Sequence, residues 1–275
     1  MNMWEKLQNI DPRWYYYLLV LVVALPIIKP WGLPIKVGPE ARSFYETVEA
    51  LPQGSTIFLC VGYRTDSVVE MDPQLGTFFK QALDKGLKVI AWAAVDEGAM
   101  VAQTVLGTIA EERGAVYGKD WINLGFKPIS DALLQKMIDD FHQAMAYSEI
   151  GGGSLDSFEI TKNFHSIKQA ELIVCLSNVT PSPGERMIRM ISIPTGLPIV
   201  MGTGSVSVPG EMPYYASGQY KGLLAGLRGA AEYELLTDYP GSAILGMDAQ
   251  SAAHFLVIAL IAIGNIGFFL TRKGR

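Results

Sequence analysis

An uncharged apolar stretch near the C-terminus constrains this chain more than any other feature of its sequence. Residues 252–270 read AAHFLVIALIAIGNIGFFL and contain no Asp, Glu, Lys or Arg. Their number is close to the roughly 20 residues with which a helix crosses about 30 Å of bilayer hydrocarbon. Arg272, Lys273 and Arg275 follow, as at a cytoplasmic membrane boundary. A buried core helix is the alternative, but an all-apolar terminal helix with a basic end favours a membrane span.

A second, shorter apolar run lies near the N-terminus. Residues 14–28 read WYYYLLVLVVALPII, and Trp31 follows, so aromatic residues flank the run as in an interfacial belt. The competing interpretation is a secretory signal peptide with Lys6 and Arg13 as its positive region. No clear small-residue cleavage site follows the run, which favours an uncleaved anchor. We therefore expect one transmembrane helix at each end of the chain.

The basic residues around the two runs indicate an orientation. Those at the outer ends of the runs are Lys6, Arg13, Arg272, Lys273 and Arg275. On the inner side, basic residues follow the first run but none lies between residues 235 and 252. The positive-inside rule then places both termini in the cytoplasm and the intervening domain on the other side of the plasma membrane.

These features divide the chain into five segments. They are an N-terminal tail (1–13), a first transmembrane helix with an interfacial segment (14–35), an extramembrane α/β domain (36–245), a second transmembrane helix (246–271) and a basic tail (272–275). In the domain, apolar strand-like runs alternate with helical patterns, which predicts a parallel sheet covered on both faces. We predict a Rossmann-like open, mostly parallel sheet of about five strands with flanking helices.

The elements of this domain can be bounded from turn residues and periodicity. We expect strands at 55–63, 87–95, 117–126, 169–177 and 197–201, and helices at 39–51, 72–85, 97–113, 130–146, 183–193 and 217–236. The segment 206–215 contains Pro209 and Pro213, so we expect an irregular loop there.

Polar residues at the expected strand ends are the candidate ligand-binding residues, because open parallel sheets bind ligands beyond the carboxyl ends of their strands. They are Asp66, Asp96, Glu97, Asn178, Thr203 and Ser205. The first three could together offer oxygen ligands to a divalent cation. Helix capping competes with this interpretation, because helix starts favour the same residue types. Capping is the favoured role, so we expect no bound metal and no cofactor.

Signatures of nucleotide binding, catalysis and nucleic-acid binding are missing. Residues 202–205 (GTGS) follow a strand but lack the lysine of a phosphate-binding loop, and neither G-x-S-x-G nor H-E-x-x-H occurs. Cys60 and Cys175 lie in apolar strands, where a small hydrophobic role is favoured; they could pair only if those strands are neighbours. We therefore predict no catalytic residue. A net charge of −5 without a basic cluster excludes a nucleic-acid partner.

Small residues gather at two candidate packing interfaces. Gly222, Gly226 and Gly229 lie in the expected helix 217–236, where each glycine costs about 1 kcal/mol relative to alanine. Close backbone approach would compensate for this cost, either against the domain's own sheet or against a partner subunit. Gly264 and Asn265 lie in the C-terminal apolar run, where an amide in lipid needs a partner on another helix. That helix is either the first apolar run or part of another subunit.

Together these features predict a membrane-anchored, non-enzymatic assembly or scaffold protein that forms a homo-oligomer or joins a larger membrane complex. Its expected partners are the lipid bilayer and copies of itself or other membrane subunits. A membrane-tethered sensor of a small ligand or nucleotide is the alternative. A metal-dependent hydrolase that uses Asp66, Asp96 or Glu97 ranks third.

Overall fold

The computed structural model describes residues 10–272, which fall into two compact units. Residues 35–243 form an α/β domain, and the residues on either side of it form a helical unit. Most of the predicted N-terminal tail, with Lys6, and the end of the basic tail, with Lys273 and Arg275, lie outside the described residues.

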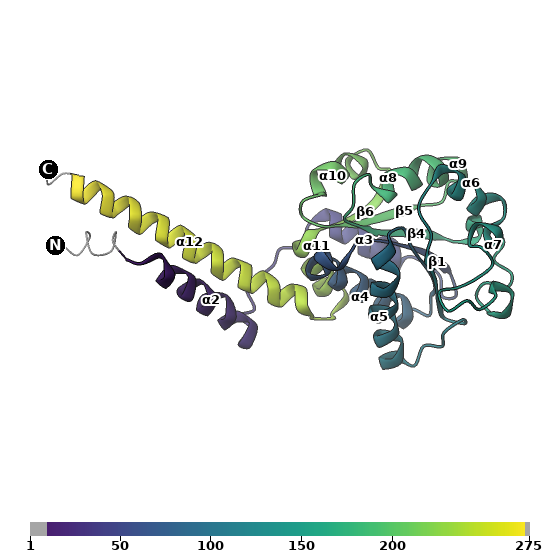
Figure 1. The fold of residues 1–275 in the computed structure, drawn as a ribbon, viewed down its shortest axis with the longest axis horizontal. Coiled ribbons are helices and arrows are strands. Elements are labelled where there is room, and N and C mark those ends of the chain that lie inside the picture. The colour runs from purple at the N-terminus through teal and green to yellow at the C-terminus, as the bar shows by residue number, and fades with distance from the viewer. Residues whose placement is uncertain (1–9, 273–275) are drawn as a thin grey trace. The chain divides into compact units, whose positions relative to one another are not determined.

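Six parallel strands form the sheet of the α/β domain (Figure 1). They are β1 (Thr56–Gly62), β2 (Lys88–Ala93), β3 (Trp121–Phe126), β4 (Leu172–Ser177), β5 (Ile199–Thr203) and β6 (Tyr220–Ala225). Their order across the sheet is β3-β2-β1-β4-β5-β6, and each neighbouring pair is parallel. The predicted α/β architecture with a parallel sheet is confirmed. Because the order reverses beside β1, the carboxyl ends of β1 and β4 form a topological switch point.

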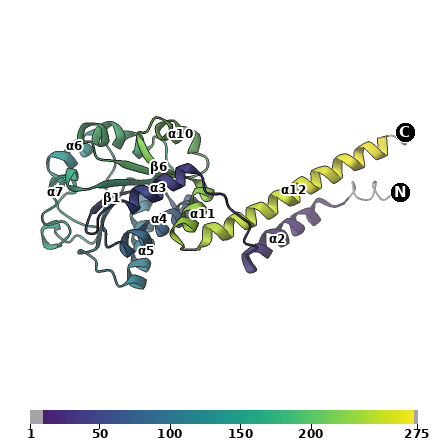
Figure 2. The same cartoon turned by 180° about the vertical axis from the view of Figure 1, so that it is seen from behind.

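Helices cover both faces of the sheet (Figures 1 and 2). On one face lie α3 (Pro39–Glu49), α4 (Val68–Asp84), α5 (Asp96–Arg113) and α11 (Gly226–Thr237). On the other lie α6 (Asp131–Asp139), α7 (Phe141–Ala144), α8 (Pro183–Met187) and α10 (Val208–Ala216), while Ile188–Ser192 and α9 (Ile193–Thr195) continue from α8. Alternate strand residues enter the two cores, so Leu59 and Cys60 of β1 point to opposite faces.

The predicted helix 217–236 is wrong in its first part, because residues 220–225 form β6 and raise the strand number from about five to six. A short apolar run does not reveal its period, and pairing with β5 decides its structure. Gly222 lies in β6, where a Cβ atom would overlap the backbone of Phe44 in α3. A Cβ on Gly229 would lie 2.8 Å from the backbone of Leu224, and one on Gly226 would overlap Ser205. The close approach expected of these glycines thus occurs within the domain.

Other element boundaries also differ from the prediction, and three of the differences matter here. The segment 206–215 is not irregular, since α10 covers most of it and has Pro209 in its first turn, where a missing N–H costs little. The helix expected at 130–146 is divided at Asp140, whose carboxylate accepts a hydrogen bond from Gln143 N and caps α7. Helix α4 begins at Val68, so Asp72 lies inside it rather than at its start.

The helical unit contains α2 (Pro12–Ile28) and most of α12 (Ser242–Arg272), which lie side by side in Figures 1 and 2. By length and composition, one helix among residues 10–272 can cross a membrane, the segment Ser242–Leu270 of 29 residues. Helix α2 is apolar but has 17 residues. At 1.5 Å per residue it is about 26 Å long, short of the roughly 30 Å of hydrocarbon. The expectation of a clear spanning helix at each end therefore holds only for the C-terminal one.

A buried carboxylate links the segment after α2 to α12. Asp248 of α12 is 1% exposed. It accepts hydrogen bonds from the backbone N–H groups of Trp31 (2.9 Å), Gly32 (2.9 Å) and Leu33 (3.1 Å). Gly32 has φ +63°, a conformation that glycine adopts without strain and that lets successive N–H groups converge on one anion.

The close approach at Gly222 yields a stability prediction. Gly222→Ala should lower the free energy of unfolding by about 1–3 kcal/mol, because the added Cβ forces α3 away from β6. Gly107→Ala in α5 is the matched control, because a Cβ there meets nothing within 4 Å. It should raise stability by about 0.5–1 kcal/mol. Chemical denaturation of the full chain in detergent, followed by circular dichroism, measures both. Equal effects of the two substitutions would contradict the described packing.

Candidate functional site

The switch point brings two of the predicted residues together. Asp66 follows β1 and Asn178 follows β4, and Ser67 bridges them. The Ser67 hydroxyl donates to Asp66 Oδ1 (2.8 Å) and accepts from Asn178 Nδ2 (2.9 Å). The Ser207 hydroxyl donates to Asn178 Oδ1 (2.9 Å). Asp66 and Asn178 therefore belong to one chain of hydrogen bonds across the switch point, as neighbouring strand ends predict.

Asp96 and Glu97 form a second group at the start of α5. Glu97 Oε2 accepts from the hydroxyl (2.6 Å) and the backbone N–H (3.1 Å) of Thr65. Asp96 Oδ1 lies 3.6 Å from Nε of Arg64, and both side chains are exposed. The hydroxyl and then the amide of Thr65 hold the pKa of Glu97 below its usual value, because they stabilise the charged form.

Thr203 and Ser205, at the end of β5, make separate contacts. Thr203 is fully buried, and its hydroxyl donates to the carbonyl oxygen of Ser177 (2.8 Å). Ser205 is exposed, and its amide and hydroxyl donate to the Glu70 carboxylate at 2.6 and 3.0 Å. Thr203 thus serves the packing of β5 against β4, while Ser205 joins the β5–α10 loop to α4.

The carboxyl edge of the sheet therefore contains three separate polar groups rather than one constellation. Within residues 10–272, no three His, Cys, Asp or Glu side chains are placed to hold a metal ion. The cation site considered for Asp66, Asp96 and Glu97 thus lacks the geometry it needs. Glu97 and Glu70 also occupy amide and hydroxyl donors that a phosphate would need.

A cavity of about 390 Å³ lies at the lateral edge of the sheet, beside the carboxyl end of the edge strand β6 and the first turns of α3 and α11. Apolar groups such as Met212 and Leu223 line it together with charged side chains. Arg228 Nε donates to Glu232 Oε1 (2.8 Å), and Glu232 Oε2 accepts from Gly38 N (3.0 Å). Because this carboxylate is already paired, the cavity does not select one class of ligand.

Helix α11 also holds both ends of the domain. Near the N-terminal end, Glu232 binds Gly38 as described above. Near the C-terminal end, Glu234 accepts from the backbone N–H groups of Gly241 (3.1 Å) and Ala243 (3.0 Å). Side chains of α11 therefore hold both of the chain segments that lead from the domain to the apolar helices.

Sequence reasoning missed the carboxylates that organise these contacts, namely Glu70, Glu232, Glu234 and Asp248. The latter three are buried, at 5, 2 and 1% exposed. A signal was present for Asp248, which is an acidic residue only four positions before the apolar stretch at Ala252. A carboxylate so close to lipid needs hydrogen-bond donors, and a glycine-containing turn such as 31–33 can supply them.

Comparison with known proteins adds no functional information: no family model, curated protein or solved structure matches this chain.

The contact between Thr65 and Glu97 yields a titration prediction. Thr65→Val removes the hydroxyl but keeps the backbone N–H, so the pKa of Glu97 should rise towards its ordinary value near 4.3. Thr65→Ser keeps the hydroxyl and should leave this pKa nearly unchanged. Carbon-detected NMR of labelled Glu carboxylates across acidic pH measures both variants. If valine and serine had the same effect, the hydroxyl would not be the dominant cause.

Proposed function

We propose that this chain is a membrane-anchored, non-enzymatic assembly protein that forms a homo-oligomer or a subunit of a larger complex in the plasma membrane. In this proposal α2 and α12 both insert in the bilayer, the termini are cytoplasmic, and the α/β domain lies outside. The observation that carries the proposal is the exposure of α12. In an apolar stretch of 18 residues of α12, only 6% of the residues are buried.

An exposed apolar helix of this length needs lipid or other helices around it. Twenty-nine residues span about 44 Å, more than the hydrocarbon thickness. Phe255, Ile258 and Phe269 are each more than 60% exposed. In water, each such side chain would forgo roughly 1.5–3 kcal/mol of burial free energy. A core helix of a soluble domain would instead be mostly buried, so insertion in a bilayer accounts better for α12.

The Asp248 contact holds the segment that follows α2 against α12, which favours α2 as a second span beside it. With 17 residues, α2 lies at the lower limit for a spanning helix, and residues 30–35 extend it by an interfacial segment. Trp31, Gly32 and Leu33 of this segment donate to Asp248. An anchor of two paired helices explains why a buried carboxylate lies just before the apolar part of α12.

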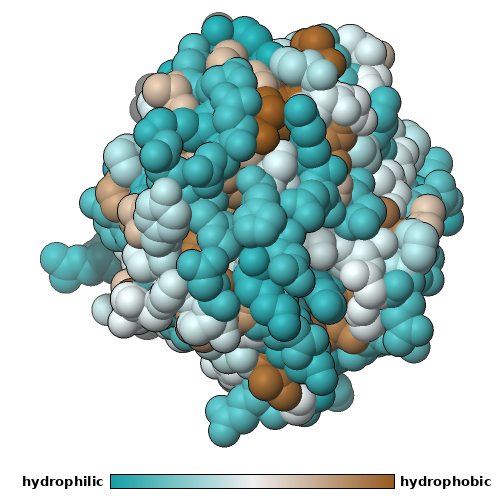
Figure 3. Space-filling view, turned by 90° about the vertical axis from the view of Figure 1, so that its right-hand side faces the viewer, coloured by the Kyte–Doolittle hydropathy of each residue, from teal (hydrophilic) through white to brown (hydrophobic). Residues whose placement is uncertain are grey.

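Assembly through the apolar helices is favoured over assembly through the surface of the α/β domain. The face that carries α6, α7 and α9 is mostly hydrophilic, with scattered hydrophobic residues (Figure 3). On α12, a Cβ at Gly264 would meet nothing within 4 Å, so a neighbouring helix can approach closely. Asn265 is exposed, and its Nδ2 donates to Ile261 O of its own helix (2.9 Å). Its amide oxygen can accept a hydrogen bond from a second helix, and lipid tails cannot supply such a donor.

The ligand-binding sensor remains the second candidate, and the strand order favours it. The order β3-β2-β1-β4-β5-β6 is that of Rossmann-like sheets that bind dinucleotides at the switch point. Against it, Asp66 and Asn178 at that point bind Ser67, and the donors nearby are used by Glu70 and Glu97. A sensor would show a higher unfolding temperature with nucleotide, which the assembly proposal does not require.

Native mass spectrometry of the full chain in detergent tests the assembly. The wild type should give a defined multimer, and Gly264→Leu with Asn265→Leu should reduce it, because the close approach and the amide are lost. Ile258→Leu, which changes only the shape of an apolar side chain, is the control. A monomeric wild type without other subunits would contradict the proposal.

Cysteine labelling tests the orientation that the proposal includes. Gly152→Cys introduces a thiol on an exposed loop, and the native Cys60 and Cys175 are fully buried, so the wild type gives the background. A membrane-impermeant maleimide should label the variant on intact cells. Labelling that occurs only after lysis would place the domain in the cytoplasm instead.

A further inference from the structure

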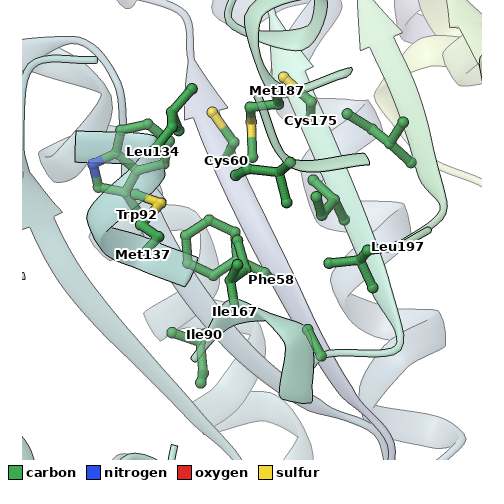
Figure 4. Packing of buried hydrophobic residues seen from close by; sticks show 14 of the residues in the cluster. Phe58, Cys60, Ile90, Trp92, Leu134, Met137, Ile167, Cys175, Met187 and Leu197 are labelled. Atoms are coloured by element: carbon green, nitrogen blue, oxygen red, sulfur yellow. The ribbon is translucent and has the colours of Figure 1, made fainter. Parts of the chain in front are cut away.

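Two thiols lie opposite each other in the middle of the sheet. Cys60 of β1 and Cys175 of β4 are in register on neighbouring parallel strands, and both are free. Both are completely buried and belong to the same core. Residues 115 positions apart in the sequence thus place two thiols beside each other on one face of the sheet, away from water (Figure 4).

Two thioethers complete this sulfur cluster. Met201 of β5 is in register with Cys175, on the next strand of the sheet. Met187 of α8 packs over the same face, and Figure 4 shows it close to both thiols. Each of these four residues has an exposed fraction of 0%. The cluster therefore offers two thiols and two thioethers from three strands and one helix.

The spacing of the strands argues against a disulfide between the thiols. Neighbouring strands lie about 4.8 Å apart, so in-register Cβ atoms are separated by about that distance. A disulfide prefers Cβ atoms about 3.5–4.5 Å apart, so it would need movement of the strands. A shared metal ion does not need this movement, because two metal–sulfur bonds of about 2.3 Å join sulfur atoms that lie up to roughly 4.6 Å apart.

We propose that Cys60 and Cys175, together with Met187 and Met201, form a buried binding site for Cu(I). Thiolate and thioether ligands are soft and select this ion. The charge also balances in the dry core, where a net charge is costly, because Cu(I) and one thiolate are together neutral. This site is independent of the proposed attachment to the membrane.

Binding exchanges a proton for the ion without a change of oxidation state. One thiol loses its proton, its sulfur forms a bond to Cu(I), and the proton leaves to solvent; the other thiol and the thioethers donate lone pairs. Because binding releases this proton, apparent affinity should rise with pH.

Competition with a Cu(I) chelator tests the site in the full-length protein. The protein, in detergent and without oxygen, is titrated with Cu(I) in the presence of bathocuproine disulfonate. The wild type should withdraw one equivalent of Cu(I) from the chelator, and X-ray absorption should show sulfur ligands only. Cys175→Ala should lose this binding. A wild type that withdraws no Cu(I), or a Cys175→Ala variant that still does, would overturn the proposal.

Two methionine substitutions, a test and its control, provide a second experiment if the Cys175→Ala variant does not fold. Met187→Leu removes a thioether from the cluster but keeps its volume, so Cu(I) affinity should fall. Met137→Leu makes the same change in α6, elsewhere in this core, and should leave affinity unchanged. Thermal denaturation of the ion-free variants checks that the two substitutions cost the same stability. Equal Cu(I) affinities for the two variants would overturn the assignment of Met187.

Discussion

The hydrogen bonds to Asp248 are the constraint on which the helical unit depends. Burial of an ionised carboxylate costs several kcal/mol unless donors replace its water. Three backbone N–H groups do so here, and hydrogen bonds to a charged group each contribute about 1.5–3 kcal/mol. Because these donors lie more than 200 residues before Asp248, the contact couples the two ends of the chain. Removal of either partner would leave a buried polar group without its hydrogen bonds.

Parts of the fold were predictable because a buried parallel strand can be identified from its own local sequence. Strands β1, β2 and β4 are uninterrupted apolar runs between turn residues, as fully buried parallel strands must be. Strand β6 could not be identified in the same way. Its sequence, YKGLLA, contains a glycine and a lysine and runs directly into α11. Its place depends on β5 and on the space that Gly222 leaves for α3, and both are tertiary contacts.

In the candidate site too, positions could be predicted from the local sequence, but contacts between distant residues could not. The rule for parallel sheets gave Asp66 and Asn178 as separate strand-end candidates, and a short hydrogen-bond chain joins them in the structure. Their partners and those of Ser205 could not be predicted, because Glu70 is 135 residues from Ser205 in the sequence. Single acidic residues in α4, α11 and α12 carry no local pattern that distinguishes a structural carboxylate from a solvated one.

The polar contacts of the α/β domain and the exposed apolar helices serve different purposes in this chain. The carboxyl edge of the sheet uses its polar groups for internal contacts, and α11 holds both segments that leave the domain. The apolar surface that remains exposed belongs mainly to α2 and α12. A domain whose polar groups are hydrogen-bonded internally and which is attached to exposed apolar helices fits the proposed role of a membrane-anchored assembly protein.

Hydrogen exchange at residues 31–33 tests most directly whether Asp248 holds the two ends together. In the full chain in lipid nanodiscs, the amides of Trp31, Gly32 and Leu33 should exchange slowly, and Asp248→Ala should make them exchange at the rate of an open loop. Amides in β4, far from the substitution in sequence, report whether the domain stays folded. Fast exchange at residues 31–33 in the wild type, or equally slow exchange in the variant, would contradict this account.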